Sequence, residues 1–289
     1  MKFWLGGLVP AEEAVVSVLD HGFTVGDGVF ETLRTAVDPR GQVRPFAPTR
    51  HLRRLARSAA GLGLPAPDLD LVAEAIEAVC QANPELVGGG RLRITYTSGV
   101  GPPGSARLAG TSTLVVTAAA SARWPATTTV ALSPWPRNEL GALAGLKTTS
   151  YAENAVMLAH ANSMGASEAL LVNIAGNVCE GTGSNVFLVF AGEALTPPLS
   201  SGCLPGITRD LLLQWCADAG IGATEADIAV DDVVGAEEIF LTSSTRDVNP
   251  VATVLDSSGA PIWSGSGAGT VTARIAAVFS DRAARDLDP

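Results

Sequence analysis

The sequence predicts a mixed α+β fold divided into two domains. Strand-like and helix-like segments alternate along the 289 residues, but without the regular strand–helix–strand spacing of a parallel sheet and without a GxGxxG turn. A hydrophobic content of 47% is enough to bury a sizeable core, which excludes a disordered chain. The segment AASARWPA separates two strand signals with small residues, Trp and Pro. We therefore expect a small domain over 1–118, a linker over 119–126 and a large domain over 127–289.

The predicted small domain contains both strands and helices. Strands are expected where β-branched residues cluster and partly alternate, and a Gly-rich turn, HGFTVGDG, separates the first two. The first helix has Pro48 and Thr49 at its start, an apolar stripe along one face and glycines that can close it. The expected elements are strands at 15–19 and 29–37, helices at 48–64 and 68–82, and strands at 91–99 and 111–120.

The predicted large domain continues the mixed pattern. A strand is followed by a Pro-rich connector, and GLKTTSYAENAVMLAHA then leads into a helix. Another helix starts directly after a glycine turn, and the last helix is amphipathic. The expected elements are strands at 127–133 and 168–173, a further strand within 176–190, a strand at 237–244, and helices at 151–164, after Gly206 and at 270–287.

Charge and composition exclude several classes of function. The net charge of −10 argues against binding to nucleic acid or to an anionic membrane. No apolar run has the length of a membrane span, and the first residues carry acids where a signal peptide needs an apolar stretch. The 4 cysteines and 3 histidines are scattered without disulfide or metal-site spacing. We therefore expect a cytoplasmic protein with buried, reduced cysteines and no metal site.

Lysine is almost absent from the chain. Of the 19 basic side chains, only Lys2 and Lys147 are lysines, and all others are arginines. An arginine guanidinium stays protonated, whereas a desolvated lysine can lose its proton and condense with a carbonyl to form a Schiff base. The internal Lys147 therefore indicates covalent amine chemistry. The alternative is a drift in composition towards arginine that left one lysine by chance.

A helix start in the large domain is suited to a phosphate group. The segment LPGITRD places Gly206, Ile207 and Thr208 at that start, where unpaired backbone N–H groups and the helix dipole attract an anion. An ordinary capped helix is the structural alternative. In the small domain, Arg54 can pair with a phosphate through two hydrogen bonds, while the neighbouring arginines are expected on a solvated face.

An acidic residue completes a set of groups with one common use. Glu180 lies in NVCEGTGSNVF beside glycines that permit close approach of the backbone. It is either a turn acid facing water or the acceptor of a proton-bearing ring nitrogen. A lysine for an aldehyde, a carboxylate for a ring nitrogen, and N–H groups with an arginine for a phosphate are together what pyridoxal phosphate requires.

The motifs that surround these residues resemble those of the class IV aminotransferases, the fold-type IV pyridoxal-phosphate enzymes. The resemblance implies a smaller N-terminal α/β domain, a larger C-terminal domain with a β-barrel-like sheet, and a homodimer. The cofactor is then expected between the domains, with the partner subunit closing the mouth of the site. The motifs are DHGFTVGDGVFET, the arginine in HLRRL, GLKTTSYAENAVMLAHANSMGASEALLVN, CEGTGSNVFLV, LTPPLSSGCLPGITRD and EEIFLTSSTRDVNPV.

Cofactor roles follow from this resemblance residue by residue. Lys147 resembles the Schiff-base lysine of the family, and Glu180 resembles the partner of the pyridine nitrogen. Tyr151 matches a tyrosine on the cofactor's phenolic oxygen, although the branched-chain enzymes place theirs one residue further from the lysine. The expected phosphate ligands are Arg54, Ile207, Thr208 and Ser244, the last standing where related enzymes usually have a threonine.

The resemblance also indicates a substrate pocket. Phe30 and Glu31 are expected on its wall, with Glu31 supporting the hydrogen-bond network of the lysine. Arg93 and Arg246 are candidates for holding a substrate carboxylate, and either can instead be a surface arginine. Ser98 stands where the common D-amino-acid aminotransferases have an arginine, so that carboxylate clamp is missing.

Three functions stay open at this point. The first is a transaminase that moves an amino group between an amino donor and a 2-oxo acid, with D-amino acids or (R)-amines favoured and L-branched-chain amino acids as a lesser alternative. The second is a lyase that releases pyruvate and 4-aminobenzoate from aminodeoxychorismate. The third is a non-catalytic binding or assembly protein, against which the intact Lys147 and Glu180 argue. We expect the transaminase.

Overall fold

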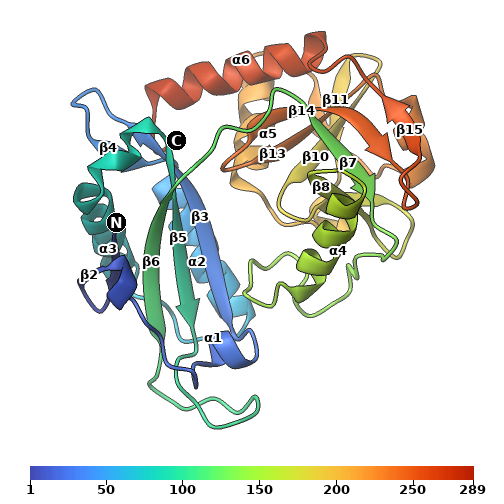
Figure 1. Ribbon diagram of the computed structural model, residues 1–289. Helices are drawn as coiled ribbons and strands as arrows, with labels where there is room; N and C mark the ends of the chain where they lie inside the picture. Colours follow the sequence, from blue (N-terminus) through green and yellow to red (C-terminus); the bar gives the residue numbers. More distant parts are fainter. The chain divides into compact units, whose positions relative to one another are not determined.

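The computed structural model describes residues 1–289, which form two compact units (Figure 1). Unit 1 comprises Met1–Ala122, Leu146–Tyr151 and Arg285–Pro289, and unit 2 comprises Arg123–Gly145 and Ala152–Ala284. The first change of unit therefore falls inside the expected linker. The sequence analysis did not predict that Leu146–Tyr151 and Arg285–Pro289 belong to unit 1.

Unit 1 is built on a six-stranded antiparallel sheet with the strand order β2-β1-β6-β5-β3-β4. Helices α2 and α3 pack against it. The strands are β1 (Lys2–Leu5), β2 (Leu8–Pro10), β3 (Gly28–Val37), β4 (Val43–Pro45), β5 (Gly90–Thr97) and β6 (Thr113–Ala120). The helices are η1 (Ala11–Glu13), α1 (His21–Thr24), α2 (Pro48–Gly61), α3 (Leu69–Ala82) and η2 (Pro84–Gly88).

The apolar stripes of the sequence become the core of unit 1. Leu33 on β3, Leu55 on α2, Val72 on α3 and Ile94 on β5 are all completely buried together. Alternation of side chains along β5 sends Leu92 and Ile94 inward, as expected for a strand that packs on one face. Side chains of β-branched and leucine residues therefore hold the two helices on the sheet.

The strand expected at 15–19 is wrong. The segment has no regular structure, and Val15, Val16, Val18 and Leu19 are exposed. Strand propensity depends on packing and pairing with a neighbour, and no strand of the sheet pairs with this segment. The sheet instead uses β1 and β2, two short strands that the sequence analysis did not identify.

Unit 2 is built on a nine-stranded mixed sheet. Its main path is β12-β11-β10-β13-β14-β7-β8-β9, and β15 pairs with β14. β9, at one end of this path, packs back against β10, so the sheet curls. The strands are β7 (Thr128–Leu132), β8 (Glu168–Val172), β9 (Val178–Gly181), β10 (Asn185–Phe190), β11 (Glu193–Thr196), β12 (Ala223–Glu225), β13 (Glu238–Ser243), β14 (Asp247–Leu255) and β15 (Pro261–Ser264).

Helices of unit 2 cover parts of this sheet. α4 packs against β7 and β8, and α5 packs against β12 and β13. The helices are α4 (Ala152–Ser163), η3 (Leu199–Ser201), α5 (Ile207–Asp218), η4 (Val230–Gly235) and α6 (Thr270–Arg285). No helix combines the length and the apolar character that crossing a membrane requires.

All four cysteines are buried and unpaired, as the sequence predicts. Burial raises the pKa of the Cys80 thiol to about 12 and the pKa values of the Cys203 and Cys216 thiols to about 11. It raises the pKa of Cys179 as well. At neutral pH the thiols are therefore protonated and behave as small apolar side chains rather than as nucleophiles.

Candidate functional site

The segment that carries Lys147 pairs with β3 in unit 1. β4 pairs only with the last residues of β3, from Thr35 to Val37, which leaves the first half of that edge open to another strand. The Phe30 N–H donates to the Lys147 carbonyl at 3.0 Å, and the Thr149 N–H donates to the Gly28 carbonyl at 2.8 Å. An antiparallel bridge between Val29 and Thr148 lies between these two bonds.

This pairing determines which way Lys147 points. Successive residues of a strand alternate between its two faces, so Lys147 lies on the same face as Phe30, one position from the bridged pair. The Lys147 Nζ atom is 4.4 Å from the centre of the Phe30 ring. On the same face, the Arg93 guanidinium lies 3.9 Å from that ring, and Tyr151 packs edge-on to it with ring centres 5.5 Å apart. Three other sequence-predicted residues, Lys147, Arg93 and Tyr151, thus meet at Phe30.

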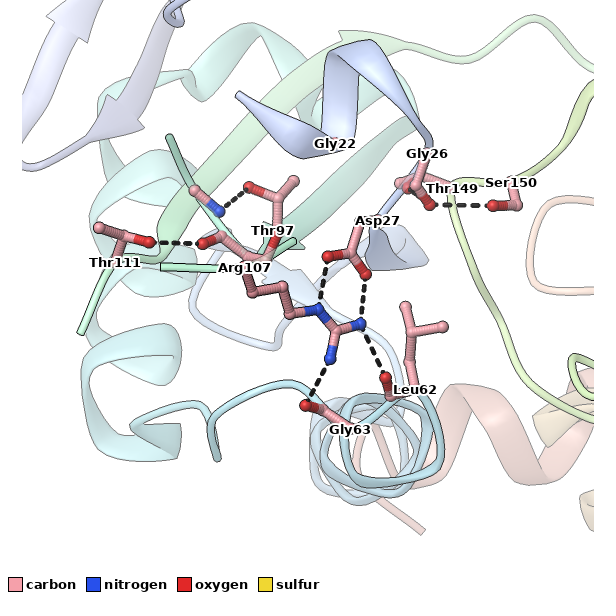
Figure 2. Close-up of polar contacts among 12 residues, drawn as sticks. Gly22, Gly26, Asp27, Leu62, Gly63, Thr97, Arg107, Thr111, Thr149 and Ser150 are labelled. Carbon is pink, nitrogen blue, oxygen red and sulfur yellow. Dashed lines mark hydrogen bonds and ion pairs between the residues drawn. The ribbon is translucent and has the colours of Figure 1, made fainter. Parts of the chain in front are cut away.

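A turn just before β3 holds the lysine segment on one side and a long loop on the other (Figure 2). The Gly26 carbonyl accepts hydrogen bonds from the hydroxyls of Thr149, at 2.9 Å, and Ser150, at 3.0 Å. A Cβ at Gly26, where φ is +70°, would lie 2.8 Å from the Ser150 hydroxyl, so glycine is required for this close approach. The turn therefore fixes the residues that follow Lys147.

Asp27 in the same turn is bound by Arg107, from the loop between β5 and β6. Arg107 Nε and Nη2 donate to the carboxylate at 2.6 and 2.5 Å, and its Nη1 and Nη2 donate to the Gly63 and Leu62 carbonyls at 2.7 and 2.9 Å (Figure 2). Burial by itself raises the pKa of Asp27, but the hydrogen bonds and charge of Arg107 bring that pKa below its ordinary value. The loop also covers Ser98, which is buried and whose carbonyl accepts the Thr111 hydroxyl.

Glu31 lies on the opposite face of β3 from Phe30, against helix α2. Its carboxylate is fully buried and accepts hydrogen bonds from Arg54 Nε and Nη2, both at 2.7 Å, and from His51 Nδ1, also at 2.7 Å. Burial by itself raises the pKa of Glu31, but the charge and hydrogen bonds of Arg54, with those of His51, lower it to about 2. Burial lowers the pKa of His51, so its neutral ring donates through Nδ1. Glu31 thus orients Arg54.

Glu180 lies in unit 2, on β9, next to the start of helix α5. Its Oε2 accepts the Leu204 N–H at 2.9 Å, and its Oε1 lies 3.7 Å from Arg137 Nη2. Two residues after Leu204, Gly206 is the N-cap of α5, and no side chain caps the helix there. The carboxylate expected on a ring nitrogen and the helix start expected at a phosphate are therefore joined by one short segment.

The start of α5 leaves no room for a side chain. A Cβ at Gly206 would lie 1.9 Å from the Asn185 Oδ1 atom, while Asn185 Nδ2 donates to the Leu204 carbonyl at 2.9 Å. Glycine is therefore required at this N-cap, and Ile207 and Thr208 follow directly as the first two residues of the helix. A helix start whose N–H groups no side chain caps fits a phosphate group.

Arg246 contacts several side chains of unit 2 through its guanidinium. It is buried, its Nη2 lies 3.6 Å from Glu168 Oε2, and its Nη1 donates to Asn249 at 3.0 Å. Its guanidinium also lies 3.5 Å from the centre of the Trp124 ring. Arg93, by contrast, is exposed. Ser244 follows the last residue of β13, in the turn to β14.

Several residues of these clusters escaped the sequence analysis. His51 lies three residues before Arg54 in α2, a spacing that puts both on one helix face, and this signal was available. The acid of the GDG turn, Asp27, was a second signal. For Arg107 and Arg137, the partners are distant in the sequence, and no local pattern identifies them.

Comparison with known proteins assigns the chain to a family. The family described as "Amino-transferase class IV" matches residues 28–254, which include Glu31, Lys147 and Glu180. The chain belongs to the class IV aminotransferases. It is therefore a transaminase of a family that works with pyridoxal 5'-phosphate, and the fold, the enzyme class and the cofactor implied by the resemblance are confirmed.

Relatives of known name and structure agree with this assignment. The branched-chain-amino-acid aminotransferase of Escherichia coli is 28% identical over 298 residues, which cover 96% of this chain and 91% of that protein. Its crystal structure superposes with a TM-score of 0.88 at 27% identity, over 97% of this chain and 93% of that one. A branched-chain aminotransferase from the thermophilic archaeon Thermoproteus uzoniensis, solved with norvaline, has a TM-score of 0.81 at 27% identity, over 97% and 93% of the two chains.

The buried Glu31 carboxylate should make stability depend on pH in the acid range. Its pKa of about 2, against an ordinary value of 4.5, means that the ionised group stabilises the fold above pH 4.5 and that this stabilisation is lost as the pH falls towards 2. We expect Glu31→Gln to lower the free energy of unfolding at pH 7 by roughly 3 kcal/mol. Urea unfolding at a series of pH values measures the difference from the unchanged protein. That difference should shrink between pH 4.5 and 2, and a constant difference would contradict the prediction.

Proposed function

We propose that the protein is an amino-acid transaminase in which Lys147 binds the cofactor and moves the proton, with branched-chain L-amino acids as the leading substrate class. The observation that carries the catalytic part is the placement of Lys147 beside Phe30, Arg93 and Tyr151 on one face of β3. The substrate class rests on the names of relatives that match this chain over most of their length.

The residues of both units fit the cofactor by their chemistry. Pyridoxal 5'-phosphate, when bound, supplies an aldehyde that reacts with amines and a ring that withdraws electrons. We propose that the Glu180 carboxylate holds the proton of the ring nitrogen and that Tyr151 donates to the phenolic oxygen. The proposed phosphate ligands are Arg54, the N–H groups at Ile207 and Thr208, and Ser244. The helix start at Gly206, which no side chain caps, supports this assignment.

Lys147 then acts as both the binding amine and the proton carrier. Its primary amine can bind the aldehyde of the cofactor. Once a substrate amine has replaced it there, the freed Nζ can remove a proton from the substrate carbon and deliver it to a nearby carbon of the cofactor. The two hydrogen bonds to β3 fix the backbone of Lys147 during this exchange, and the Phe30 ring limits where the amine can lie. A positioned amine of this kind is what proton transfer between two nearby carbons requires.

The lysine assignment predicts that Lys147→Ala abolishes transamination and removes the cofactor link that borohydride reduces to a stable bond. Circular dichroism should show an unchanged fold, because Lys147 is only half-buried and its backbone bonds to β3 do not need the side chain. Lys2→Ala, which removes the other lysine of the chain, is the control and should leave both readouts unchanged. Peptide mapping of the reduced protein locates the link, and a link at Lys2 would refute the assignment.

Arg93 is the better candidate for holding the substrate carboxylate. It is exposed and lies on the face of Phe30 and Lys147, whereas the guanidinium of Arg246 is buried against Glu168, Asn249 and Trp124. We therefore propose that Arg93 contacts substrate and that Arg246 acts through packing. Ser98 is buried under the loop that Arg107 holds, which supports a role in the wall rather than in charge recognition.

A second substrate class stays open. The names of the relatives do not test the D-amino-acid and (R)-amine preference on this chain. The D-amino-acid and (R)-amine preference therefore stays a prediction beside the branched-chain proposal. The aminodeoxychorismate lyase reaction stays a third possibility, because it needs the same lysine.

A half-reaction decides among these substrates. We expect L-leucine, L-valine or L-isoleucine, mixed singly with the cofactor-loaded protein and no acceptor, to convert the bound cofactor to its amine form, which absorbs at a shorter wavelength. D-amino acids, (R)-amines and aminodeoxychorismate form the rest of the panel, with pyruvate measured in parallel. Faster conversion by the D-amino acids or (R)-amines would replace the branched-chain proposal. Release of pyruvate without conversion of the cofactor to its amine form would show that the protein is the lyase.

We also propose a homodimer that works in the cytoplasm. Unit 1 exposes a group of large apolar side chains over and near its first helix, which a second copy of the chain can cover. The unpaired cysteines support a reducing compartment. The exposed apolar residues are Val15, Val16, Val18, Leu19, Phe23, Val25, Val100 and Leu108.

The dimer proposal predicts that Phe23→Asp weakens self-association. Phe23 is 72% exposed in α1, so a charge there costs the monomer little but opposes burial at an interface. Sedimentation velocity over a range of concentrations should show a dimer for the unchanged protein and a shift towards monomer for the variant. Leu140→Asp, at a residue of unit 2 that is 87% exposed, is the control and should leave the dimer intact. A fully active monomer of the unchanged protein would refute the proposal.

A further inference from the structure

Arg137 and Glu180 lie on the same face of the unit 2 sheet, on opposite sides of strand β8. Beyond the end of β7, Arg137 forms a parallel bridge with Asn173, and its N–H donates to the Val172 carbonyl at 2.8 Å. Glu180 on β9 pairs with Leu171 on β8. Residues 171 and 173 of one chain face the same way, and cross-strand partners share a face, so the arginine and the carboxylate project from one side of the sheet.

The two side chains are close enough to interact electrostatically. Arg137 Nη2 lies 3.7 Å from Glu180 Oε1, and the side chains are only 16% and 12% exposed. The other carboxylate oxygen accepts the Leu204 N–H at 2.9 Å. One oxygen of Glu180 therefore faces the Arg137 cation, and the other accepts a backbone hydrogen bond. Both contacts favour the ionised carboxylate over the protonated one.

The remaining contacts of Arg137 hold it in this position. Its Nη2 donates to Asn154 Oδ1 at 3.0 Å, and its Nη1 lies 3.2 Å from Glu153 Oε2, both on helix α4. Asn154 is itself buried and donates to the Thr182 carbonyl at 2.7 Å. The Arg137 Nε atom is buried and has no acceptor in the protein, so one N–H of the guanidinium stays unused.

A carboxylate that shares a proton with a ring nitrogen has two arrangements. In one the nitrogen keeps the proton and both groups are charged, and in the other the carboxylate takes the proton and both are neutral. The ring withdraws electrons far better in the charged arrangement. A cation close to the carboxylate favours the charged arrangement, because it stabilises the negative oxygen atoms.

We infer that Arg137 is a positioning residue that keeps Glu180 ionised, so that the shared proton stays on the ring nitrogen of the cofactor. This inference rests on the proposed function, in which Glu180 holds that nitrogen. Arg137 acts through Glu180 and has no contact of its own with substrate in this role. It adds to the proposed site a residue that none of the motifs of the sequence contains.

A double-variant experiment tests the inference. We expect Arg137→Gln to slow the half-reaction with amino acid about tenfold, the effect of one partly buried charge pair. Glu180→Gln should slow it on the order of a hundredfold or more. The variant with both changes should match Glu180→Gln alone, because the arginine has no carboxylate left to act on. Arg137→Lys, which keeps a positive charge, should recover most of the lost rate.

A spectroscopic readout separates charge from structure. The absorption spectrum of the cofactor-loaded protein, recorded against pH without substrate, should change at a different pH in Arg137→Gln than in the unchanged protein. Arg282→Gln, which removes an arginine of unit 2 that pairs with Asp218, is the control and should change neither the rate nor the spectrum.

Three results would overturn the inference, and they are distinguishable. If Arg137→Gln has its full effect in the presence of Glu180→Gln, the arginine acts through structure and not through the carboxylate. If Glu180→Gln is slow but Arg137→Gln has the rate and spectrum of the unchanged protein, the inference fails while the proposed function stands. A normal rate for Glu180→Gln removes the proposed role of Glu180, and the inference falls with it.

Discussion

The position of Lys147, the proposed catalytic lysine, depends on a short stretch of strand pairing. Residues 147–149 add to the half of the β3 edge that β4 leaves open, through two backbone hydrogen bonds and one bridge. Because the register of a strand determines which face each side chain occupies, this pairing alone places Lys147 over Phe30 and away from the core. A shift of the pairing by one residue would exchange Lys147 with Thr148, which is buried. The hydroxyls that bind the Gly26 carbonyl oppose such a shift.

The two faces of β3 contact different parts of the proposed site. Phe30 faces the lysine, and Glu31, the next residue, faces helix α2 and binds Arg54. Strand alternation therefore lets one dipeptide contact the Lys147 amine on one side and the Arg54 guanidinium on the other. The buried charge of Glu31 is tolerated only because Arg54 and His51 satisfy both of its oxygens. Replacing either member of this dipeptide disturbs a different part of the proposed site.

Local sequence patterns predicted much of this fold. The apolar stripes of α2 and α3 and the β-branched runs of β3, β5 and β6 lie within a few residues of their expected bounds, because these elements bury the side chains that reveal them. The isolation of Lys147 among arginines was likewise visible in the composition. The strand expected at 15–19 failed because β-branched residues form a strand only where a partner strand is available.

Long-range contacts could not be predicted in the same way. The sequence makes Arg93 and Arg246 equal candidates for binding a carboxylate. Only the fold distinguishes the exposed Arg93 over the Phe30 ring from the buried Arg246 beside Glu168. Asp27 lies 80 residues from Arg107 in the sequence, and Glu180 is likewise far from Arg137. Electrostatic pairs of this kind carry no periodic signal, so they become visible only when the chain is folded.

Unit 1 cannot be completed until the end of the chain has been synthesised, because its residues come from three separate segments. This unit needs Leu146–Tyr151 and Arg285–Pro289 in addition to its first 122 residues. The Ala47 N–H, at the start of α2, bonds to the Leu287 carbonyl, and Thr49 bonds to Asp288. A ribosome therefore delivers the first part of unit 1 long before the segments that complete it. The open edge of β3 and the start of α2 must wait in the nascent chain for partners that emerge much later, so unit 2 has its full sequence before unit 1 can close.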